Sequence, residues 1–348
     1  MKARTSFTAP CLTSAPPSFL GAVQRCLGLA ACLGAAALAL AAAPGQGAAQ
    51  RAITTADMEA LYARPIGPAT TGGRIHDVEV VPGDPSTILV GTASGGLWKT
   101  TNRGTTWTNV FFGMPVSTFG DIAIAPSNPR VVYAGTGEQQ NRQSSSYGNG
   151  VYRSDDGGDT WRHMGLDETR HTGKIVVHPT NPDVVWVGGL GNLWAPSEDR
   201  GVFKSVDGGE SWSKVLYVDT LTGVIDLEID TPNPNVLYAP TYQRLRRDWG
   251  FTGGGPGRGI YKSTDGGETW QELTGGIPDS DKGRIGIALS ESNPNVLMAL
   301  IETADSETTG VYRSENAGAT WEMVNDQNIR PMYYSHIYID PNDDERVY

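Results

Sequence analysis

The stretch Ser154-Asp-Asp-Gly-Gly-Asp-Thr-Trp161 decides the fold, because variants of this pattern occur five times in the chain. The other four copies occupy residues 100–107, 205–212, 263–270 and 314–321, so successive tryptophans lie 51 to 58 residues apart. A repeat of about 50 residues that contains several short strands is typical of propeller blades. The repeat period therefore predicts the architecture before any local motif is considered.

Each repeat contains the same order of strand signals. An alternating apolar stretch, which predicts a first strand, lies at residues 75–80, 121–124, 174–177, 224–229 and 284–289. After an Asx-Pro turn, a second strand is predicted at 88–90, 131–133, 184–187, 236–238 and 296–298. A third strand precedes each tryptophan motif, at 97–99, 151–153, 202–204, 260–262 and 311–313. We therefore predict an all-β fold, a β-propeller of four-stranded blades with Asp-box turns.

The two ends of the chain differ from the five full blades. Residues 1–50 carry three basic residues, no acid and a Leu/Ala-rich run, which predicts a signal peptide at 1–49 and export to the periplasm or the extracellular space. Residues 50–72 are interpreted as a lead-in segment with one short helix at 55–62, and 73–348 as the propeller. A sixth blade begins at 335–339 and the chain ends inside its second strand. We therefore expect this chain to be a piece of a longer protein, with an incomplete propeller.

Charge and cysteine content limit the partners. All three cysteines (Cys11, Cys26 and Cys32) lie in the predicted signal peptide, so the exported chain has none to form disulfides. The formal net charge is −11, and all 38 acidic residues come after residue 50. An acidic chain is a poor match for nucleic acid, and the apolar run is too short for a membrane span. The expected partner is a protein, peptide or glycan, and no cofactor is expected.

The repeated motif has the form Ser-x-Asp-x-Gly-x-Thr-Trp, an Asp-box. Its Asp is predicted to sit in a tight turn and to accept backbone N–H bonds. Two copies carry Asn, which keeps the acceptor but cannot act as a general base. The motif is therefore interpreted as structural, with the turn residue and the tryptophan of the five copies at Asn102 and Trp107, Asp156 and Trp161, Asp207 and Trp212, Asp265 and Trp270, and Asn316 and Trp321.

These boxes, together with Arg64-Pro-Ile-Gly-Pro68, Gly91-Thr-Ala-Ser-Gly-Gly-Leu-Trp-Lys99 and Gly135-Thr-Gly-Glu138, resemble the secreted bacterial Asp-box (BNR) repeat propellers. Members of this group are labelled sortilin/VPS10-like, WD40/YVTN/BNR-like or glycosyl hydrolase. The resemblance covers residues 64–348. It implies the propeller fold directly, whereas one propeller scaffold carries many functions.

The resemblance includes family-74 endoglucanases, which cut xyloglucan and carry their catalytic base in an Arg-Thr-Asp-Ile-Gly-Gly-Ala-Tyr-Arg pattern. Ala93 stands at the position of that Asp, and glycoside hydrolysis normally needs two carboxylates. Sialidases add an arginine cluster and a tyrosine nucleophile. Sortilins and photosystem assembly factors use similar propellers to hold proteins or peptides without catalysis.

The sequence thus favours an exported, non-catalytic binding propeller that engages its ligand through a loop-rich rim, and no catalytic residue is assigned. The alternative is a glycoside hydrolase, family-74-like or sialidase-like, with carboxylates outside the Ala93 position.

Loops on a rigid scaffold carry function, and three long ones, at 136–149, 188–200 and 240–258, are predicted to share one rim. The third combines arginines with aromatic residues, the types enriched at binding hot spots. The predicted binding residues are Glu138, Asn141, Arg142, Trp194, Tyr242, Arg244, Arg247 and Trp249.

Polar residues on or beside the first strands are predicted to line a central channel. They are His76, Asp121, His171, Lys174, Arg284 and His336, with Asp77 and Asp226 beside them. His76 and Asp77 are adjacent on a strand and are expected to point to opposite faces. No His-x-His spacing is present, so no metal site is predicted.

Overall fold

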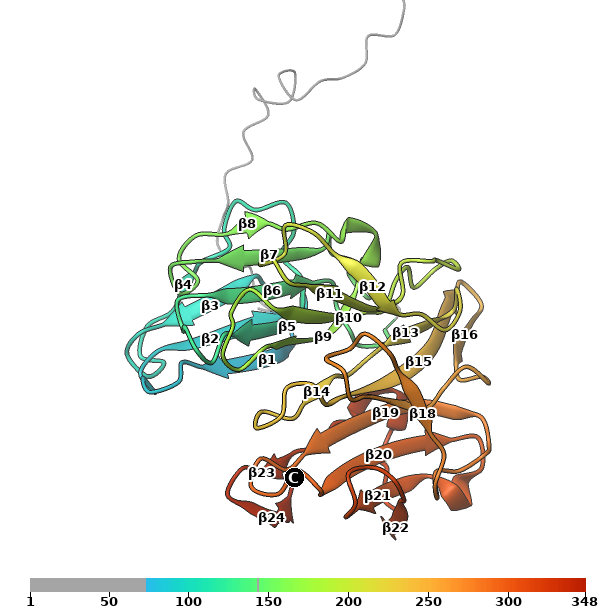
Figure 1. Cartoon of the computed structure of the whole chain (residues 1–348). Coiled ribbons are helices and arrows are strands. Elements are labelled where there is room, and N and C mark those ends of the chain that lie inside the picture. The colour runs from blue at the N-terminus through green and yellow to red at the C-terminus, as the bar shows by residue number, and fades with distance from the viewer. Residues whose placement is uncertain (1–72, 143) are drawn as a thin grey trace, which may run out of the picture. The chain divides into compact units, whose positions relative to one another are not determined.

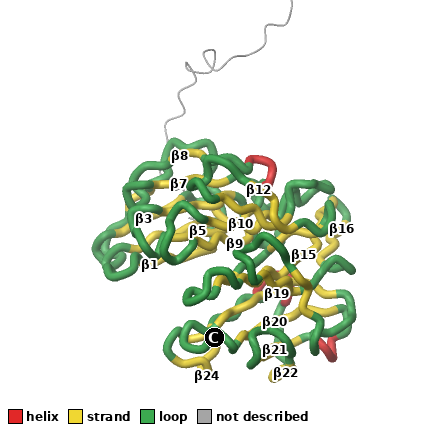
Figure 2. The backbone as a smooth tube through the Cα atoms, viewed as in Figure 1, coloured by secondary structure: helices red, strands yellow, loops and turns green. Residues whose placement is uncertain are grey.

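A computed structural model describes residues 73–142 and 144–348, and this part of the chain consists almost entirely of β-strands and turns (Figure 1). Its helical segments are short: two 3-10 turns at Asp167–Thr169 and Ser306–Thr308, and the helix α2 at Pro331–Tyr334 (Figure 2). The predicted signal peptide at 1–49, the predicted lead-in segment at 50–72 and its predicted helix at 55–62 lie outside the described residues.

Four antiparallel sheets have four strands each, connected in chain order. They are β1 (Ile75–Val80), β2 (Ile88–Thr92), β3 (Leu97–Thr100) and β4 (Thr108–Asn109); β5 (Phe119–Ile124), β6 (Val132–Thr136), β7 (Val151–Ser154) and β8 (Arg162–His163); β9 (Thr172–Val177), β10 (Val185–Gly189), β11 (Gly201–Ser205) and β12 (Ser213–Leu216); and β19 (Lys282–Leu289), β20 (Leu297–Thr303), β21 (Gly310–Ser314) and β22 (Glu322–Asn325). The strands recur where the hydrophobic alternation predicts them.

The remaining large sheet departs from the prediction. Its first strand is interrupted, into β13 (Thr222–Val224) and β14 (Glu228–Ile229). Its second strand, β15 (Leu237–Arg247), extends far beyond the predicted residues and pairs with β16 (Gly250–Gly253) in an antiparallel hairpin. The sheet is completed by β17 (Ile260–Ser263) and β18 (Gln271–Leu273). Much of the predicted loop at 240–258 is therefore a β-hairpin.

A two-stranded hairpin, β23 (Ile339–Asp340) and β24 (Asp343–Val347), follows α2. Its turn lies at the predicted Asp-Pro-Asn sequence, and backbone bonds between Tyr338 and Tyr348 (3.1 and 2.9 Å) extend the pairing by one residue. This hairpin corresponds to the predicted start of a sixth blade. The blade number of the complete ring remains a prediction.

The Asp-box turns are closed by their own side chains. In the second box, Asp156 Oδ1 accepts the Thr160 backbone N–H (2.9 Å) and Asp156 Oδ2 accepts the Thr160 hydroxyl (2.6 Å). In the fifth, Asn316 Oδ1 accepts the Thr320 N–H (2.8 Å), while Asn316 Nδ2 donates to the Thr320 hydroxyl (2.8 Å). Asn can replace Asp here because the turn needs an acceptor and not a charge.

The second, fourth and fifth Asp-boxes also pack against the second strand of the preceding sheet. A Cβ atom on Gly158 would lie 2.8 Å from Leu89, and one on Gly267 would lie 2.7 Å from the Trp186 ring nitrogen. These distances are shorter than van der Waals contact, so the second glycine of the box permits the close approach. The Trp186 ring N–H donates to Gly266 O (3.1 Å) across the same junction.

Basic residues of the third strands strengthen these junctions. Lys99 Nζ lies 2.7 Å from Asp159 in the next sheet, and Arg153 Nη1 lies 2.7 Å from Asp183. Lys204 Nζ lies 2.5 Å from Glu268 in the fourth Asp-box. The apolar-aromatic-basic pattern of the third strand therefore joins one sheet to the next. Along the inner edge, β1 packs beside β5 and β5 beside β9 (Figure 1).

Backbone strain in the fifth Asp-box gives a test of this turn. Ala317 has φ 55°, in a left-handed conformation that the equivalent Gly266 of the fourth box adopts with φ 74°. That conformation destabilises a residue with a Cβ by about 1–2 kcal/mol. Replacing Ala by Gly removes this strain but raises the entropy of the unfolded chain, which offsets part of the gain in stability. We expect Ala317→Gly to raise the free energy of unfolding by about 0.5–1 kcal/mol in urea melts.

The matched change is Gly266→Ala, which should lower the free energy of unfolding by about 1 kcal/mol. A Cβ at Gly266 meets no atom nearer than 3.5 Å, so backbone conformation dominates this loss. If Ala317→Gly destabilises the protein as well, the turn is not strained in the way described.

Candidate functional site

The antiparallel order of each sheet separates two faces. The Pro turns between the first and second strands and the Asp-boxes between the third and fourth lie at one end of each sheet. The connections between the second and third strands lie at the opposite end. These include the segment after β6, the segment between β10 and β11, and the β15–β16 hairpin. We call this end the rim.

The segment after β6 turns inward and is buried. Glu138 and Asn141 are 0% and 4% exposed, and Asn141 contacts the Tyr242 hydroxyl. Arg244, which is also fully buried, donates to Asn141 Oδ1 (3.1 Å) and to Gln139 O (2.7 Å). Four of the predicted binding residues, Glu138, Asn141, Tyr242 and Arg244, are therefore placed in an internal network. Strand alternation along β15 turns Tyr242 and Arg244 inward, which a loop interpretation could not anticipate.

Glu138 is held by basic side chains. It contacts Arg74, and His76 Nε2 lies 3.7 Å from its carboxylate. Burial by itself would raise the pKa of Glu138, but the facing His76 and Arg74 outweigh it and hold the pKa below the usual 4.5. His171 binds the Glu138 carbonyl oxygen through Nδ1 (2.8 Å). Glu138 is thus an ionised group that fastens the buried segment.

The other predicted binding residues remain at the rim. Trp249 is 81% exposed and Trp194 is 41% exposed, and Arg247 lies over the Trp249 ring, with its guanidinium carbon 6.0 Å from the ring centroid. The backbone N–H of Arg246 donates to Leu193 O (2.7 Å) and so joins the Trp194 segment to the β15–β16 hairpin. A cavity of about 570 Å³ lies between them, lined by Trp194, Arg246, Arg247, Asp248, Trp249, Gly250 and Phe251. We call this the tryptophan pocket.

A second rim cavity adjoins it, with a volume of about 720 Å³. Its lining includes two predicted residues, Asn141 and Arg142. It also includes residues outside the predicted set: Arg74, Arg246, Arg330, Tyr333 and Tyr334. We call this the arginine pocket. The basic-aromatic sequence Arg330-Pro-Met-Tyr-Tyr334 was a signal that could have revealed it. Both rim cavities have volumes within the range of ligand sites.

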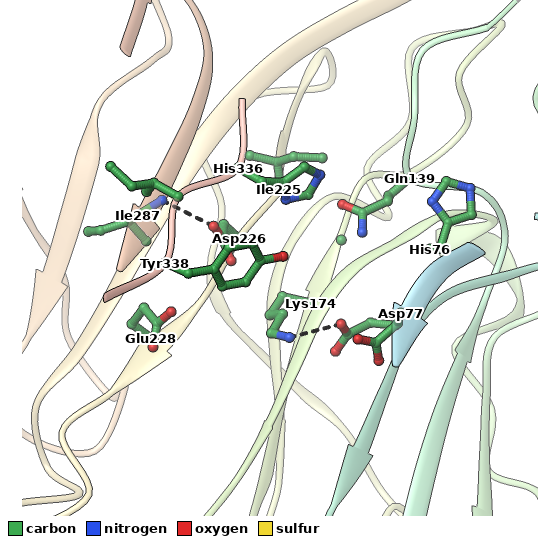
Figure 3. Close-up of a pocket in the computed structure, with 13 residues that line it drawn as sticks. His76, Asp77, Gln139, Lys174, Ile225, Asp226, Glu228, Ile287, His336 and Tyr338 are labelled. Carbon is green, nitrogen blue, oxygen red and sulfur yellow. Dashed lines mark hydrogen bonds and ion pairs between the residues drawn. The ribbon is translucent and has the colours of Figure 1, made fainter. Parts of the chain in front are cut away.

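The central channel contains a smaller cavity of about 70 Å³, lined among others by His76, Asp77, Asp121, Lys174, Asp226 and His336 (Figure 3). Of the predicted channel residues, His171 and Arg284 are buried outside this lining. The volume is well below that of a ligand site. A few waters are the largest content it accommodates.

Inner-strand carboxylates of this channel bind the neighbouring strand. Asp77, Asp121 and Asp226 each accept a backbone N–H from the next sheet, at 2.8, 2.7 and 3.1 Å. Lys174 Nζ lies 3.0 Å from Asp121. Although burial acts to lower it, the surrounding carboxylates raise the pKa of Lys174 well above its usual value. The pair therefore serves to hold the inner strands together.

One channel expectation was wrong. His76 and Asp77 both line the cavity, because the pairing of β1 with β2 shifts register between Ile75 and Asp77. A bulge places one extra residue on a strand and re-aims its side chains.

His336 also lines the channel cavity. Burial and the nearby Arg284 guanidinium lower the pKa of His336 to about 3, so this imidazole is neutral.

Ala93 is fully buried at the end of β2 and supplies no carboxylate. Within residues 73–142 and 144–348, no three His, Cys, Asp or Glu side chains gather as metal ligands. In the same residues, no helix is long and apolar enough to span a membrane.

Comparisons with known proteins agree with the repeat and the fold. The BNR/Asp-box repeat family matches residues 261–272. The xyloglucanase Xgh74A of Acetivibrio thermocellus is 25% identical over 304 residues, covering 76% of this chain and 34% of that protein. A xyloglucanase of Hypocrea jecorina is 28% identical over 204 residues, covering 51% of this chain and 22% of that protein. The chain thus spans about a third or less of the length of these relatives.

Solved structures give the same picture. An ancestral GH74 enzyme superposes with a TM-score of 0.59 at 23% identity, covering 81% of this chain and 35% of that one. The GH74 enzyme of Niastella koreensis gives a TM-score of 0.58 at 18% identity, covering 78% and 43%. The sortilin and VPS10 part of the sequence-based resemblance has no support in these relatives. The comparisons support a BNR-repeat chain with a propeller-type fold.

The Glu228 carboxyl group, which lines the channel cavity, is expected to make the stability of the protein depend on pH. Burial and the adjacent Asp226 raise the pKa of Glu228 from 4.5 to about 8. The folded protein then binds this proton more tightly than the unfolded chain, so stability falls as the pH rises from about 4.5 to 8. We expect Glu228→Gln to stabilise the protein at pH 8 by on the order of 1–2 kcal/mol, since water partly reaches the side chain, and to change little at pH 4.5.

Urea melts at several pH values measure this effect. The exposed Glu210 on the outer surface provides the control, and Glu210→Gln should keep the wild-type pH slope. Parallel pH profiles for wild type and Glu228→Gln would contradict the assignment.

Proposed function

We propose that this chain is the glycan-engaging part of a glycoside-hydrolase-type propeller, which binds a xyloglucan-like polysaccharide across its rim. The observation that carries the proposal is the similarity to xyloglucanases over 76% of the chain. A match of that extent necessarily includes the middle of the chain, which contains Trp194 and Trp249.

The rim chemistry supports a sugar ligand. Trp194 and Trp249 are exposed and both line the tryptophan pocket, where their aromatic faces can stack on the apolar faces of sugar rings. Aromatic side chains supply large contact areas at small entropic cost and retain polar edges for hydroxyl groups. The pocket volume of about 570 Å³ accommodates more than one sugar ring. Export through the predicted signal at 1–49 would bring the rim to extracellular polysaccharide.

Hydrolysis requires an acid and a base, and position 93 supplies neither. A hydrolytic reaction would therefore draw on carboxylates other than that position. The second candidate function is glycan binding without cleavage, which the buried Ala93 specifically favours. The two functions share the rim and differ only in whether the bound chain is cut.

Release of reducing ends separates these functions. The protein is incubated with xyloglucan, an unsubstituted β-glucan and starch, each against a heat-inactivated control. Release from xyloglucan establishes hydrolysis, whereas binding without release establishes the non-catalytic alternative. If the protein neither binds any β-glucan nor releases reducing ends from one, the proposal is refuted.

A rim tryptophan gives the corresponding affinity test. Removing an aromatic contact costs about 0.5–1.5 kcal/mol beyond its buried area, so Trp249→Ala should weaken xyloglucan-oligosaccharide binding about tenfold in calorimetry. Trp107→Ala is the matched control, because Trp107 is 39% exposed in an Asp-box at the opposite end of its sheet. Equal affinities for wild type and Trp249→Ala would exclude the tryptophan pocket as the binding surface.

A further inference from the structure

The arginine pocket combines four guanidinium groups with two tyrosines. Arg74, Arg142, Arg246 and Arg330 line it from four separate parts of the chain. Arg74 contacts the buried Glu138. In the described part of the chain, the other three arginines make no ion pair with a carboxylate. This concentration of positive charge occurs in a protein whose net charge is −11.

Two further arginines are buried against residues 139–141, next to the lining residues Asn141 and Arg142. Arg244 and Arg284 are 0% and 2% exposed, and their hydrogen bonds go to neutral groups of residues 139–141 and to His336. Nε and Nη2 of Arg244 have no hydrogen-bond partner among the described residues. Buried cations raise the electrostatic potential of a nearby cavity. The carboxylates near them, Glu138 beside Arg244 and Asp226 and Glu302 beside Arg284, offset part of this effect.

Aromatic rings fix the orientation of two of the lining arginines. The guanidinium carbon of Arg330 lies 5.1 Å from the Tyr333 ring centroid and 5.8 Å from that of Tyr334. That of Arg246 lies 5.3 Å from the Phe251 ring centroid. A guanidinium over an aromatic face keeps its N–H groups available at the edge, where they match both oxygens of a carboxylate.

From this arrangement we propose that the arginine pocket binds the carboxylate of an acidic sugar, a uronate carried by the glycan. The inference rests on the proposed glycan-binding function and adds a charge preference to it. Arg246 lines both rim cavities, so an oligosaccharide stacked on Trp249 extends directly into the arginine pocket. Its neutral rings contact the tryptophans, and its carboxylate faces Arg142, Arg246 and Arg330.

Calorimetry with the whole protein tests this preference. The probes are an oligogalacturonate, the same oligosaccharide as its methyl ester, and a neutral xyloglucan oligosaccharide. We expect the free uronate to bind at least tenfold more tightly than its ester, and this advantage to shrink at high salt. Arg330→Gln should abolish the advantage, so that the free uronate binds no more tightly than its ester.

Arg162→Gln is the matched control, since Arg162 is 54% exposed and pairs with Glu210 beyond the second Asp-box. Equal binding of uronate and ester, or an undiminished advantage in Arg330→Gln, overturns the inference. Tighter binding of a Glu-rich hexapeptide than of the uronate overturns it in favour of a peptide site. Absence of binding by all three saccharides refutes the proposed function itself, whereas neutral binding without a uronate advantage refutes only the charge preference.

Discussion

The junction between one Asp-box and the second strand of the preceding sheet is the contact on which the structure depends. The box glycine lets the turn approach Leu89 or Trp186 more closely than any side chain would permit. Basic side chains of the third strands then pair with carboxylates of the next sheet, as Lys99 does with Asp159. The same small motif closes its own turn in all five copies and contacts the second strand of the preceding sheet in three of them. The repeats therefore specify a succession of sheets without any disulfide among the described residues.

This use of the Asp-box end leaves the other end of each sheet free to vary. One rim segment turns inward, where Gln139, Gln140 and Asn141 are bound by Arg244 and Arg284 from later sheets. The β15–β16 hairpin extends outward and carries Trp249. The rim therefore contains a rigid internal network below and exposed aromatic and basic groups above. A glycan surface needs this combination, since fixed aromatic planes lose little entropy when a sugar stacks on them.

Much of the fold could be predicted from the sequence because strand alternation, Asx-Pro turns and Asp-boxes are local signals. The candidate site was predictable only in part. Glu138 and Arg244 looked like rim residues, yet long-range pairing buries them, and no local signal reports a partner a hundred residues away. The extension of β15 was missed because its charged residues resemble a solvated loop. Arg74 and Arg330 approach each other only through the folded sheets, so composition alone could not unite them.

The central claim is that the rim, and not the Asp-box end or the channel, is where this protein meets its ligand. Hydrogen–deuterium exchange with and without a saturating xyloglucan oligosaccharide tests it most directly, because it reports every segment at once. The account predicts slowed exchange at residues 193–197 and 246–253, with unchanged exchange in the Asp-box turns. Protection confined to the Asp-box turns or to the channel strands would contradict it.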